Sequence, residues 1–260
     1  MIKIEVINAK GEVLASGAGN LEYNKKYENG DKIRIILDGC KFAKLQLAKS
    51  LKESIVYIPG GEYIFDIPFD EHTAIYAPGT WSEDYNIISA VPADESEIYV
   101  KRNIALNSAA QRYKTECYPY AKANFVTRDE PWFEERNSID GVIEQASHGS
   151  YPYQSYAGGA REDIDYTLYF GTNVTVDEII LYLRADFKDD HDTYWKSMTI
   201  EFSDGTRMPI TLQKPTGGQS FKPEKPVITD RIHLCDFKQA ANPLSWAALT
   251  QIEVMGSINK

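Results

Sequence analysis

The feature that most constrains the fold of this chain is a succession of short segments in which apolar and polar residues alternate. Residues 32–37 alternate and end at an Asp-Gly turn, and residues 195–202 and 208–212 flank a second Asp-Gly pair. Alternation with a period of two places one face of a strand against a core, and an Asp-Gly pair between such strands is a hairpin signal. No segment has the periodicity of a long helix. The sequence therefore predicts an all-β protein.

The length and the spacing of the strands predict two domains. A chain of 260 residues is long for one modest domain and sufficient for two. Residues 1–95 contain six or more strand-like segments, which predicts a small N-terminal β-sandwich. An acidic stretch near residues 90–102 is interpreted as the linker, and residues 103–260 form the second predicted domain.

Composition excludes several classes of partner. The formal net charge of −10 argues against a nucleic-acid partner, which requires a basic face. No window approaches the roughly 18 apolar residues of a membrane span. The first residues alternate like a strand and lack the apolar run of a secretory signal, so we expect cytoplasmic residence. The sequence leaves the oligomeric state open.

Cysteine and histidine positions predict no clustered site. Cys40, Cys117 and Cys235 are odd in number and widely spaced, which fits neither a disulfide framework nor a zinc site built on close pairs. We interpret them as buried small hydrophobic residues. His72 and His233 stand singly in strand-like contexts and are interpreted as structural.

Three separated motifs identify a family resemblance. They are Arg-Asn-Ser-Ile-Asp-Gly at residues 136–141, Tyr-Pro-Tyr-Gln-Ser-Tyr at residues 151–156, and the terminal strand with its glycine at residues 249–256. Residues about 103–257 resemble the discoidin domain (F5/8 type C), and within it the carbohydrate-binding modules of family 32. The resemblance implies a galactose-binding-like jelly-roll β-sandwich that binds carbohydrate and is not catalytic.

A calcium site is predicted from the same motifs. Calcium prefers six to eight oxygen ligands that mix carboxylates with backbone carbonyls. Asp140 lies in a turn with the carbonyls of Asn137 and Ser138, and Glu253 lies in the terminal strand. The resemblance implies a structural calcium ion held by these residues, although residues 142–150 replace the usual continuation of the motif. The alternative is that Asp140 caps a β-turn and Glu253 is solvated.

The candidate ligand site is a long loop region rich in aromatic residues. Sugars are held by aromatic faces and by forked donors such as arginine. If the basic residues converge, they form a basic rim in an acidic protein, which favours an acidic or oligomeric sugar. The alternative is that the aromatic residues fill the sandwich and the arginines pair with carboxylates. The predicted ligand-binding residues are Trp132, Arg136, His148, Tyr151, Tyr153, Arg161, Arg184, Trp195 and Lys196.

Two other functions stay open. The first is a carbohydrate-active enzyme with a site at the domain interface, for which Asp70, Glu71 and His72 are the compact candidates in the first domain. Common hydrolase and phosphate-binding motifs are absent, and the adjacent Glu134 and Glu135 would point to opposite sides of an extended chain. The second is a protein-interaction scaffold, because discoidin domains also bind proteins and lipid surfaces.

Overall fold

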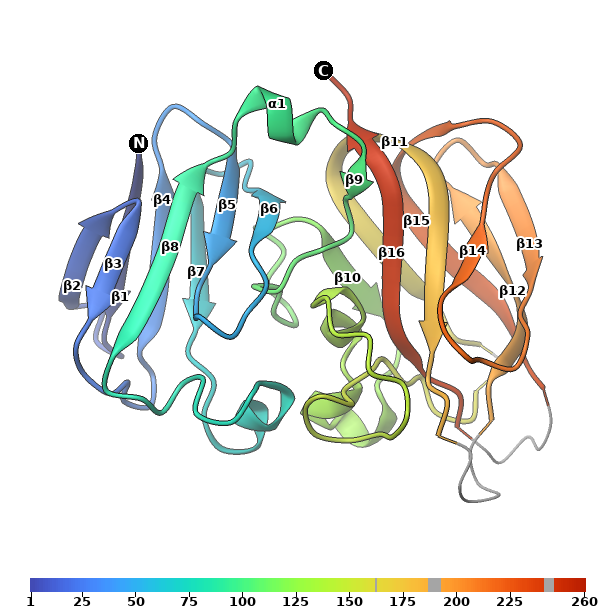
Figure 1. The fold of residues 1–260 in the computed structure, drawn as a ribbon, viewed down its shortest axis with the longest axis horizontal. Helices are drawn as coiled ribbons and strands as arrows, with labels where there is room; N and C mark the ends of the chain where they lie inside the picture. The colour runs from blue at the N-terminus through green and yellow to red at the C-terminus, as the bar shows by residue number, and fades with distance from the viewer. Residues whose placement is uncertain (162, 187–192, 241–245) are drawn as a thin grey trace.

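The computed structural model describes residues 1–161, 163–186, 193–240 and 246–260, and it forms two β-rich lobes side by side (Figure 1). The paired strands of its three sheets are antiparallel, which confirms the predicted all-β class. Among the described residues, no helix has the length and apolar composition needed to cross a membrane. The helical elements are α1 (Glu95–Ile98) and the 3-10 turns η1 (Asp70–Ile75), η2 (Thr127–Asp129), η3 (Pro131–Phe133) and η4 (Glu135–Ile139).

The N-terminal lobe is a sandwich of two four-stranded sheets, with strand orders β2-β1-β4-β7 and β3-β8-β5-β6. Its inward positions alternate as the sequence predicted: Ile4, Ile33 and Phe65 from one sheet and Leu45 and Ile88 from the other are fully buried in a common core. The strands are β1 (Ile2–Ile7), β2 (Val13–Ala18), β3 (Asn20–Tyr23), β4 (Lys32–Leu37), β5 (Phe42–Gln46), β6 (Ser54–Tyr57), β7 (Glu62–Asp66) and β8 (Asn86–Pro92).

The C-terminal lobe is an eight-stranded antiparallel jelly-roll sandwich with the order β13-β12-β15-β11-β16-β9, and β10 and β14 also pair with β11. Its core is a second apolar cluster in which Trp195, Phe202 and Phe237 are almost fully buried. The strands are β9 (Arg102–Asn103), β10 (Tyr120–Ala123), β11 (Tyr166–Leu183), β12 (Trp195–Phe202), β13 (Arg207–Thr211), β14 (Gln219–Phe221), β15 (Val227–Gln239) and β16 (Leu249–Ile258).

Strand β11 runs through Gly171, a position at which the sequence is equally compatible with a turn between two shorter strands. In the structure one strand of 18 residues continues through this point. Gly171 has a φ of +70°, and the pairing of β11 with β15 shifts register between Tyr169 and Val174. A Cβ atom at this position would lie 2.6 Å from the ring of Tyr118. Glycine therefore bends the strand without ending it, because only glycine fits both the backbone angle and the contact.

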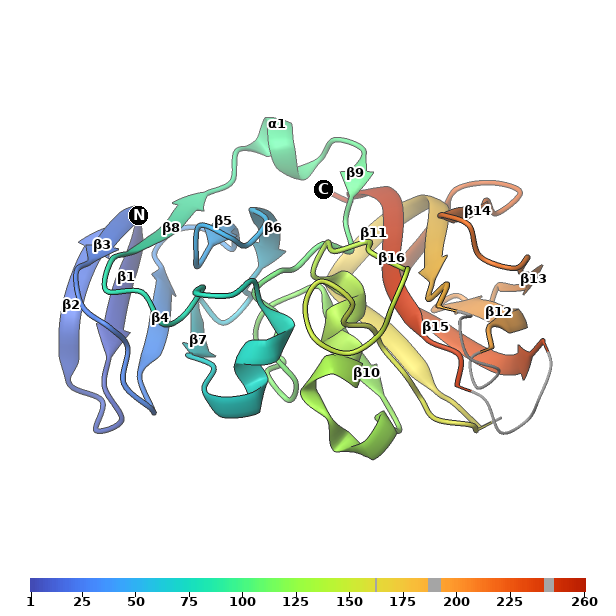
Figure 2. The same ribbon diagram turned by 60° about the horizontal axis from the view of Figure 1, so that its bottom comes forward.

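Direct contacts connect the two lobes. The Tyr63 hydroxyl donates a hydrogen bond to the carbonyl of Ala109 (2.6 Å). The Gln111 side chain accepts from the backbone N–H of Asp66 and donates to its carbonyl, both at 2.8 Å, and Lys114 forms an ion pair with Asp66 (2.8 Å). Short helical turns of both lobes lie on the same side of the molecule (Figure 2). These contacts fix the two surfaces that face each other across the lobe interface.

Candidate functional site

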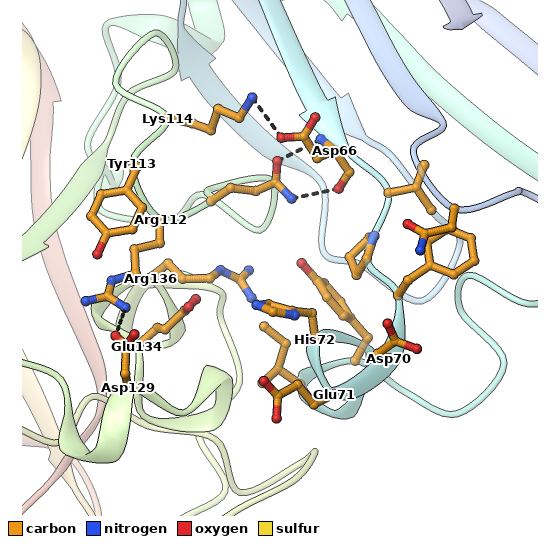
Figure 3. Close-up of a pocket in the computed structure, with 17 residues that line it drawn as sticks. Asp66, Asp70, Glu71, His72, Arg112, Tyr113, Lys114, Asp129, Glu134 and Arg136 are labelled. Atoms are coloured by element: carbon orange, nitrogen blue, oxygen red, sulfur yellow. Dashed lines mark hydrogen bonds and ion pairs between the residues drawn. The ribbon is translucent and has the colours of Figure 1, made fainter. Parts of the chain in front are cut away.

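A cleft of about 560 Å³ lies between the two lobes. One wall is the segment Asp66–Tyr76, which follows β7 and contains η1. The opposite wall consists of Gln111–Lys114 together with Asp129, Glu134 and Arg136 from the turns η2 to η4 and their caps (Figure 3). Charged side chains from both lobes line this space. A ligand bound here would therefore contact both lobes.

Arg136 brings a buried positive charge to this cleft. The residue is 3% exposed, and its Nε has no hydrogen-bond partner. Its terminal nitrogens face neutral acceptors at long distances, the Ser108 carbonyl at 3.4 Å and the Asn137 side-chain oxygen at 3.5 Å. The guanidinium also lies 5.3 Å from the centre of the Tyr76 ring. Arg136 forms no ion pair with a described residue, and the carboxyl groups of Glu134 and Asp140 interact with its charge only at longer range, so an anionic group of a ligand would supply a direct partner.

Three buried carboxyl groups near Arg136 have raised pKa values. Burial raises the pKa of Glu134, which lines the cleft, and it raises the pKa of Glu135 to about 7 and that of Asp140 to about 6. The positive charges of Arg136 and Arg112 offset part of this effect. The charge of this region therefore changes with pH near neutrality.

Backbone strain is concentrated at the cleft. Among the described residues, five that are not glycine have a positive φ, and three of these line the cleft: Asp70 (50°), Tyr113 (66°) and Asp129 (56°). A fourth, Arg128 (52°), is adjacent in sequence. A left-handed conformation costs an ordinary residue about 1–2 kcal/mol. Such conformations cluster at functional sites, where the surrounding structure holds them in place.

Tyr113 presents an aromatic face at this site. Tyr113 is 75% exposed, and the Arg112 guanidinium lies 4.7 Å from the centre of its ring. Arg112 in turn forms an ion pair with Asp129 (Figure 3). The sequence prediction missed these residues. The sequence feature that could have indicated them is the polar and aromatic run Gln111–Lys114, which directly follows a stretch of small buried residues.

The structure does not bring the predicted ligand-binding residues together on one rim. Of the nine, Arg136 lines the interlobe cleft. Tyr151 is 38% exposed and shares with Arg136 a smaller adjoining cavity of about 100 Å³. Trp132 is half-buried, with its indole N–H donating to Glu130 (3.0 Å), and Tyr153 is also half-buried.

The other predicted residues lie in separate environments. Trp195 is fully buried against Phe237, because strand alternation turns it into the core and leaves the adjacent Lys196 exposed. A sugar cannot reach the Trp195 ring there. Arg184 is also buried, at 2% exposure. The Arg184 guanidinium donates a hydrogen bond to the carbonyl of Trp246. His148 bonds to Asp186 (2.9 Å), and Arg161 donates to Asp163 (2.8 Å).

The interface alternative named three residues that do line the cleft: Asp70, Glu71 and His72. All three are exposed and lie on η1 (Figure 3). Glu134, on the opposite wall, is buried. The chain therefore places acidic groups of both lobes around one space, which the sequence pattern alone did not reveal.

The predicted calcium ligand Asp140 is engaged by hydrogen-bond donors. Its Oδ1 accepts from the N–H of Val142 (2.7 Å) and its Oδ2 accepts from the amide of Gln154 (2.8 Å). The Lys52 ammonium donates to the carbonyl of Gly141. Because this positively charged ammonium group lies next to Asp140, it would repel a cation bound there.

The other predicted ligands are also committed to hydrogen bonds. The Asn137 amide donates to two backbone carbonyls, and the Ser138 hydroxyl bonds to a carbonyl and to the Tyr166 hydroxyl. Glu253 lies on β16, where its Oε2 is 3.4 Å from the Tyr182 hydroxyl. These hydrogen bonds engage the side chains of Asn137 and Ser138, whereas the predicted ligands there are the backbone carbonyls, so calcium stays a prediction for a binding measurement.

No protein-family model and no curated protein matches the chain. Several solved structures are similar to it. One is chitosan-binding module 1 of a chitosanase/glucanase from Paenibacillus sp. IK-5, with 17% identity over 59% of this chain and 98% of that chain and a TM-score of 0.39. Another is the family 32 carbohydrate-binding module of C. perfringens NanJ in complex with galactose, with 12% identity over 52% and 91% and a TM-score of 0.39.

A third is a fucose-binding module of Streptococcus pneumoniae, with 13% identity over 59% of this chain and 96% of that chain and a TM-score of 0.40. These neighbours are carbohydrate-binding modules, the class named by the resemblance of residues 103–257 to discoidin and family 32 domains. At these scores they identify neither a ligand nor a binding residue of this chain.

Proposed function

We propose that this protein binds carbohydrate without cleaving it, and that the ligand is an acidic sugar or oligosaccharide held in the interlobe cleft. The observation that carries the proposal is Arg136, a buried guanidinium that lines the cleft and forms no ion pair with a described residue. The resemblance of residues 103–257 to family 32 modules supports carbohydrate as the class of ligand.

The chemistry of the walls favours a sugar that carries a carboxylate. A guanidinium matches a carboxylate in a planar, two-bonded geometry, and such charge-assisted bonds are stronger than neutral ones. The exposed ring of Tyr113 offers a face on which the C–H groups of a sugar can stack. A uronic acid unit placed between Arg136 and Tyr113 would use both features.

An adjoining cavity supports an oligomeric ligand. It has a volume of about 310 Å³ and shares Pro68 and Phe69 with the cleft. Tyr27 and Trp81 line it, and the Tyr27 hydroxyl and the Trp81 indole N–H are buried without hydrogen-bond partners. Aromatic residues with unused donors suit a second sugar unit with ring oxygens and hydroxyls. The proposed ligand would then extend from the cleft onto the N-terminal lobe.

An enzyme acting on carbohydrate is the second candidate. The observation that favours it is Glu134, a buried carboxyl whose pKa is raised by burial, in the same cleft as Asp70 and His72. A carboxyl group with a raised pKa suits a general acid. Release of reducing ends from an acidic oligosaccharide, abolished in Glu134→Gln, would establish this function in place of simple binding.

Calorimetry with matched ligands tests the binding proposal. The probes are a uronic acid oligosaccharide and its methyl ester, which keeps the rings and removes the charge. We expect the acid to bind and the ester to lose roughly 10- to 100-fold in affinity, because a charge-assisted bond contributes about 1.5–3 kcal/mol. Equal affinity for the two probes, or no binding of either, would contradict the proposal.

Tyr113→Ala tests the location without disturbing a core. The residue is exposed, so we expect unchanged thermal unfolding and an affinity lower by roughly 2- to 10-fold, the range for a stacking contact. Tyr85→Ala is the matched control, because Tyr85 is 47% exposed and is not among the residues that line the cleft. Equal losses in the two variants would remove the cleft as the site.

A further inference from the structure

The outer face of the C-terminal sheet carries a cluster of three different ligand types. Glu201 on β12 lies directly opposite His233 on β15, and Cys235 follows two residues later on the same strand. Their inward neighbours Ile200 and Leu234 are fully buried, so alternation turns the three polar side chains to the outer face. One ligand atom from each of the three lies within 4.8 Å of the others.

His233 lies beside a second carboxylate. Its Nε2 lies 3.2 Å from Oδ2 of Asp165, at ion-pair distance but without hydrogen-bond geometry, and its Nδ1 lies 3.9 Å from Oε1 of Glu201. If a small ring rotation turned the Nε2–H toward Asp165, the neutral imidazole would keep Nδ1 free of a proton. Histidines that bind metals show that arrangement, in which the outer carboxylate fixes the tautomer and the ring orientation.

We propose that Glu201, His233 and Cys235 form a site for a divalent transition-metal ion, with zinc as the best match. Zinc takes thiolate, imidazole and carboxylate ligands in tetrahedral geometry, at bond lengths of about 2.0–2.3 Å. Ligand atoms that already lie within 4.8 Å of one another reach that geometry through small side-chain rotations. All three residues are half-buried, so solvent or a small ligand can take the fourth position.

Arg207 is the internal competitor for this site. Its guanidinium lies 3.3 Å from Glu201 and 2.6 Å from Asp236, and its Nη2 is 3.8 Å from the Cys235 sulfur. Asp236 has a positive φ of 55° at a bulge in β15, which places its side chain beside Cys235. Metal binding must displace Arg207 from Glu201, after which Asp236 can retain the guanidinium.

The sequence prediction excluded a zinc site because the cysteines lack close partners along the chain. In the structure the premise of that prediction does not hold. His233 and Cys235 lie two positions apart on β15, and Glu201 lies opposite them on the paired strand β12. The structure also shows that Cys235 is half-buried on the outer face, whereas Cys117 is buried as expected.

Titration of the full chain with Co2+ in a reductant without thiols tests the proposal. We expect a near-ultraviolet band from thiolate-to-cobalt charge transfer, strong visible bands of a tetrahedral ion, and loss of both when Zn2+ is added. Because Cys235 must lose its proton, we expect the apparent affinity to rise with pH. Absence of the thiolate band in both the native chain and Arg207→Gln would overturn the site.

Variants assign the ligands. Cys235→Ser should abolish the thiolate band and His233→Ala should weaken binding at least about 10-fold, whereas Cys40→Ser, the matched control, should change neither. Asp165→Asn should weaken binding roughly 10- to 100-fold through the orientation of the imidazole. Arg207→Gln should bind more tightly because the competing cation is gone.

A thiolate band that persists in Cys235→Ser would contradict the assignment. Thermal unfolding of the metal-free variants, which we expect to match that of the native chain, shows that any loss of binding does not come from unfolding. None of the varied residues lines the interlobe cleft, so acidic-sugar binding should be unchanged in the same variants. The two proposals can therefore fail separately.

Discussion

Two buried charges, one in each half of the molecule, have different surroundings. Glu5 on β1 is 2% exposed and is paired with Lys3 (2.5 Å) and with Arg34 on β4. Arg136 on η4 is 3% exposed and faces neutral acceptors at 3.4 Å and 3.5 Å. The hydrogen bond from Lys3 is the main cause that lowers the pKa of Glu5. Arg136 forms no such ion pair with a described residue, and Asp140 and Glu134 interact with its charge only at longer range.

This difference separates a structural charge from a charge suited to a ligand. The sandwich around Glu5 supplies both counter-ions from its own strands, so nothing more is needed there. Around Arg136 the chain supplies burial and an open cleft but no direct ion pair among the described residues. A buried cation without a direct ion pair contributes little to folding stability, which is why we assign it to binding.

Replacement of Arg136 by methionine is expected to have the largest effect. Arg136→Met removes the proposed carboxylate partner, so affinity for a uronic acid oligosaccharide should fall at least about 100-fold. The unfolding midpoint should change little, because the guanidinium forms no ion pair with a described residue and the nearby carboxyl groups of Glu134 and Asp140 can take up protons when it is removed. Calorimetry and thermal unfolding measure the two quantities.

Arg184→Met is the matched control for that variant. Arg184 is equally buried but bonds to the carbonyl of Trp246 and does not line the cleft. It should lose stability and keep its affinity for the sugar. If Arg136→Met instead loses stability and keeps affinity, then Arg136 is structural and the comparison with Glu5 no longer holds.

The pH dependence of stability should differ in sign between the two regions. Burial raises the pKa of Glu135, beside Arg136, from 4.5 to about 7. The folded state therefore holds this proton more tightly than the unfolded state. Its contribution is fully present below pH 4.5 and is lost as pH rises through about 7, which lowers the free energy of unfolding by roughly 3 kcal/mol.

Urea unfolding across this pH range measures that effect. Glu135→Gln keeps the shape of the side chain and cannot ionise, so the decline in stability between the two pKa values should become shallower. An unchanged slope in the variant would mean that the carboxyl group titrates at its ordinary pKa despite its burial.

Glu5→Gln should have a smaller effect of the opposite sign. The pKa of Glu5 is lowered in the folded state, so its stabilising contribution is present at neutral pH and is lost as pH falls through that lowered value. We expect a loss of about 1 kcal/mol at pH 7, because Lys3 and Arg34 are partly exposed and solvent screens the pairs. The native chain and the variant should converge in stability in acid, as measured by urea unfolding.

Calcium should have the smallest effect. The Lys52 ammonium donates to the carbonyl of Gly141, so we expect added Ca2+ or a chelator to leave the unfolding midpoint unchanged. A rise with Ca2+ that Asp140→Asn removes would instead establish the site implied by the family resemblance. Scanning calorimetry with and without a chelator distinguishes these outcomes.

Much of the fold followed from local patterns. Residues 32–37 alternate in sequence and form β4 with alternating burial, because a strand turns successive side chains to opposite faces. The continuation of β11 through Gly171 does not follow from the local pattern, since glycine permits both a turn and a bend and the sequence does not distinguish them.

The site followed much less from the sequence. Arg136 was predicted to bind ligand, and it lines the cleft, but the predicted partners Trp195 and Arg184 lie buried elsewhere. The opposite wall comes from η1, about 60 positions earlier in the chain by the printed numbering. No local pattern indicates which loops of two separate sandwiches will meet.

By itself, the sequence determined the all-β class, the two sandwiches and the resemblance of the second to discoidin-type modules, because alternation and turn motifs act between neighbours in the chain. The tertiary structure alone decided that Glu5 has direct ion pairs while Arg136 forms none with a described residue, and that Glu201 meets His233 and Cys235. Ion pairing and ligand geometry depend on which distant segments dock together. The docking of distant segments depends on the burial of both cores together, and no periodic pattern in the sequence indicates it.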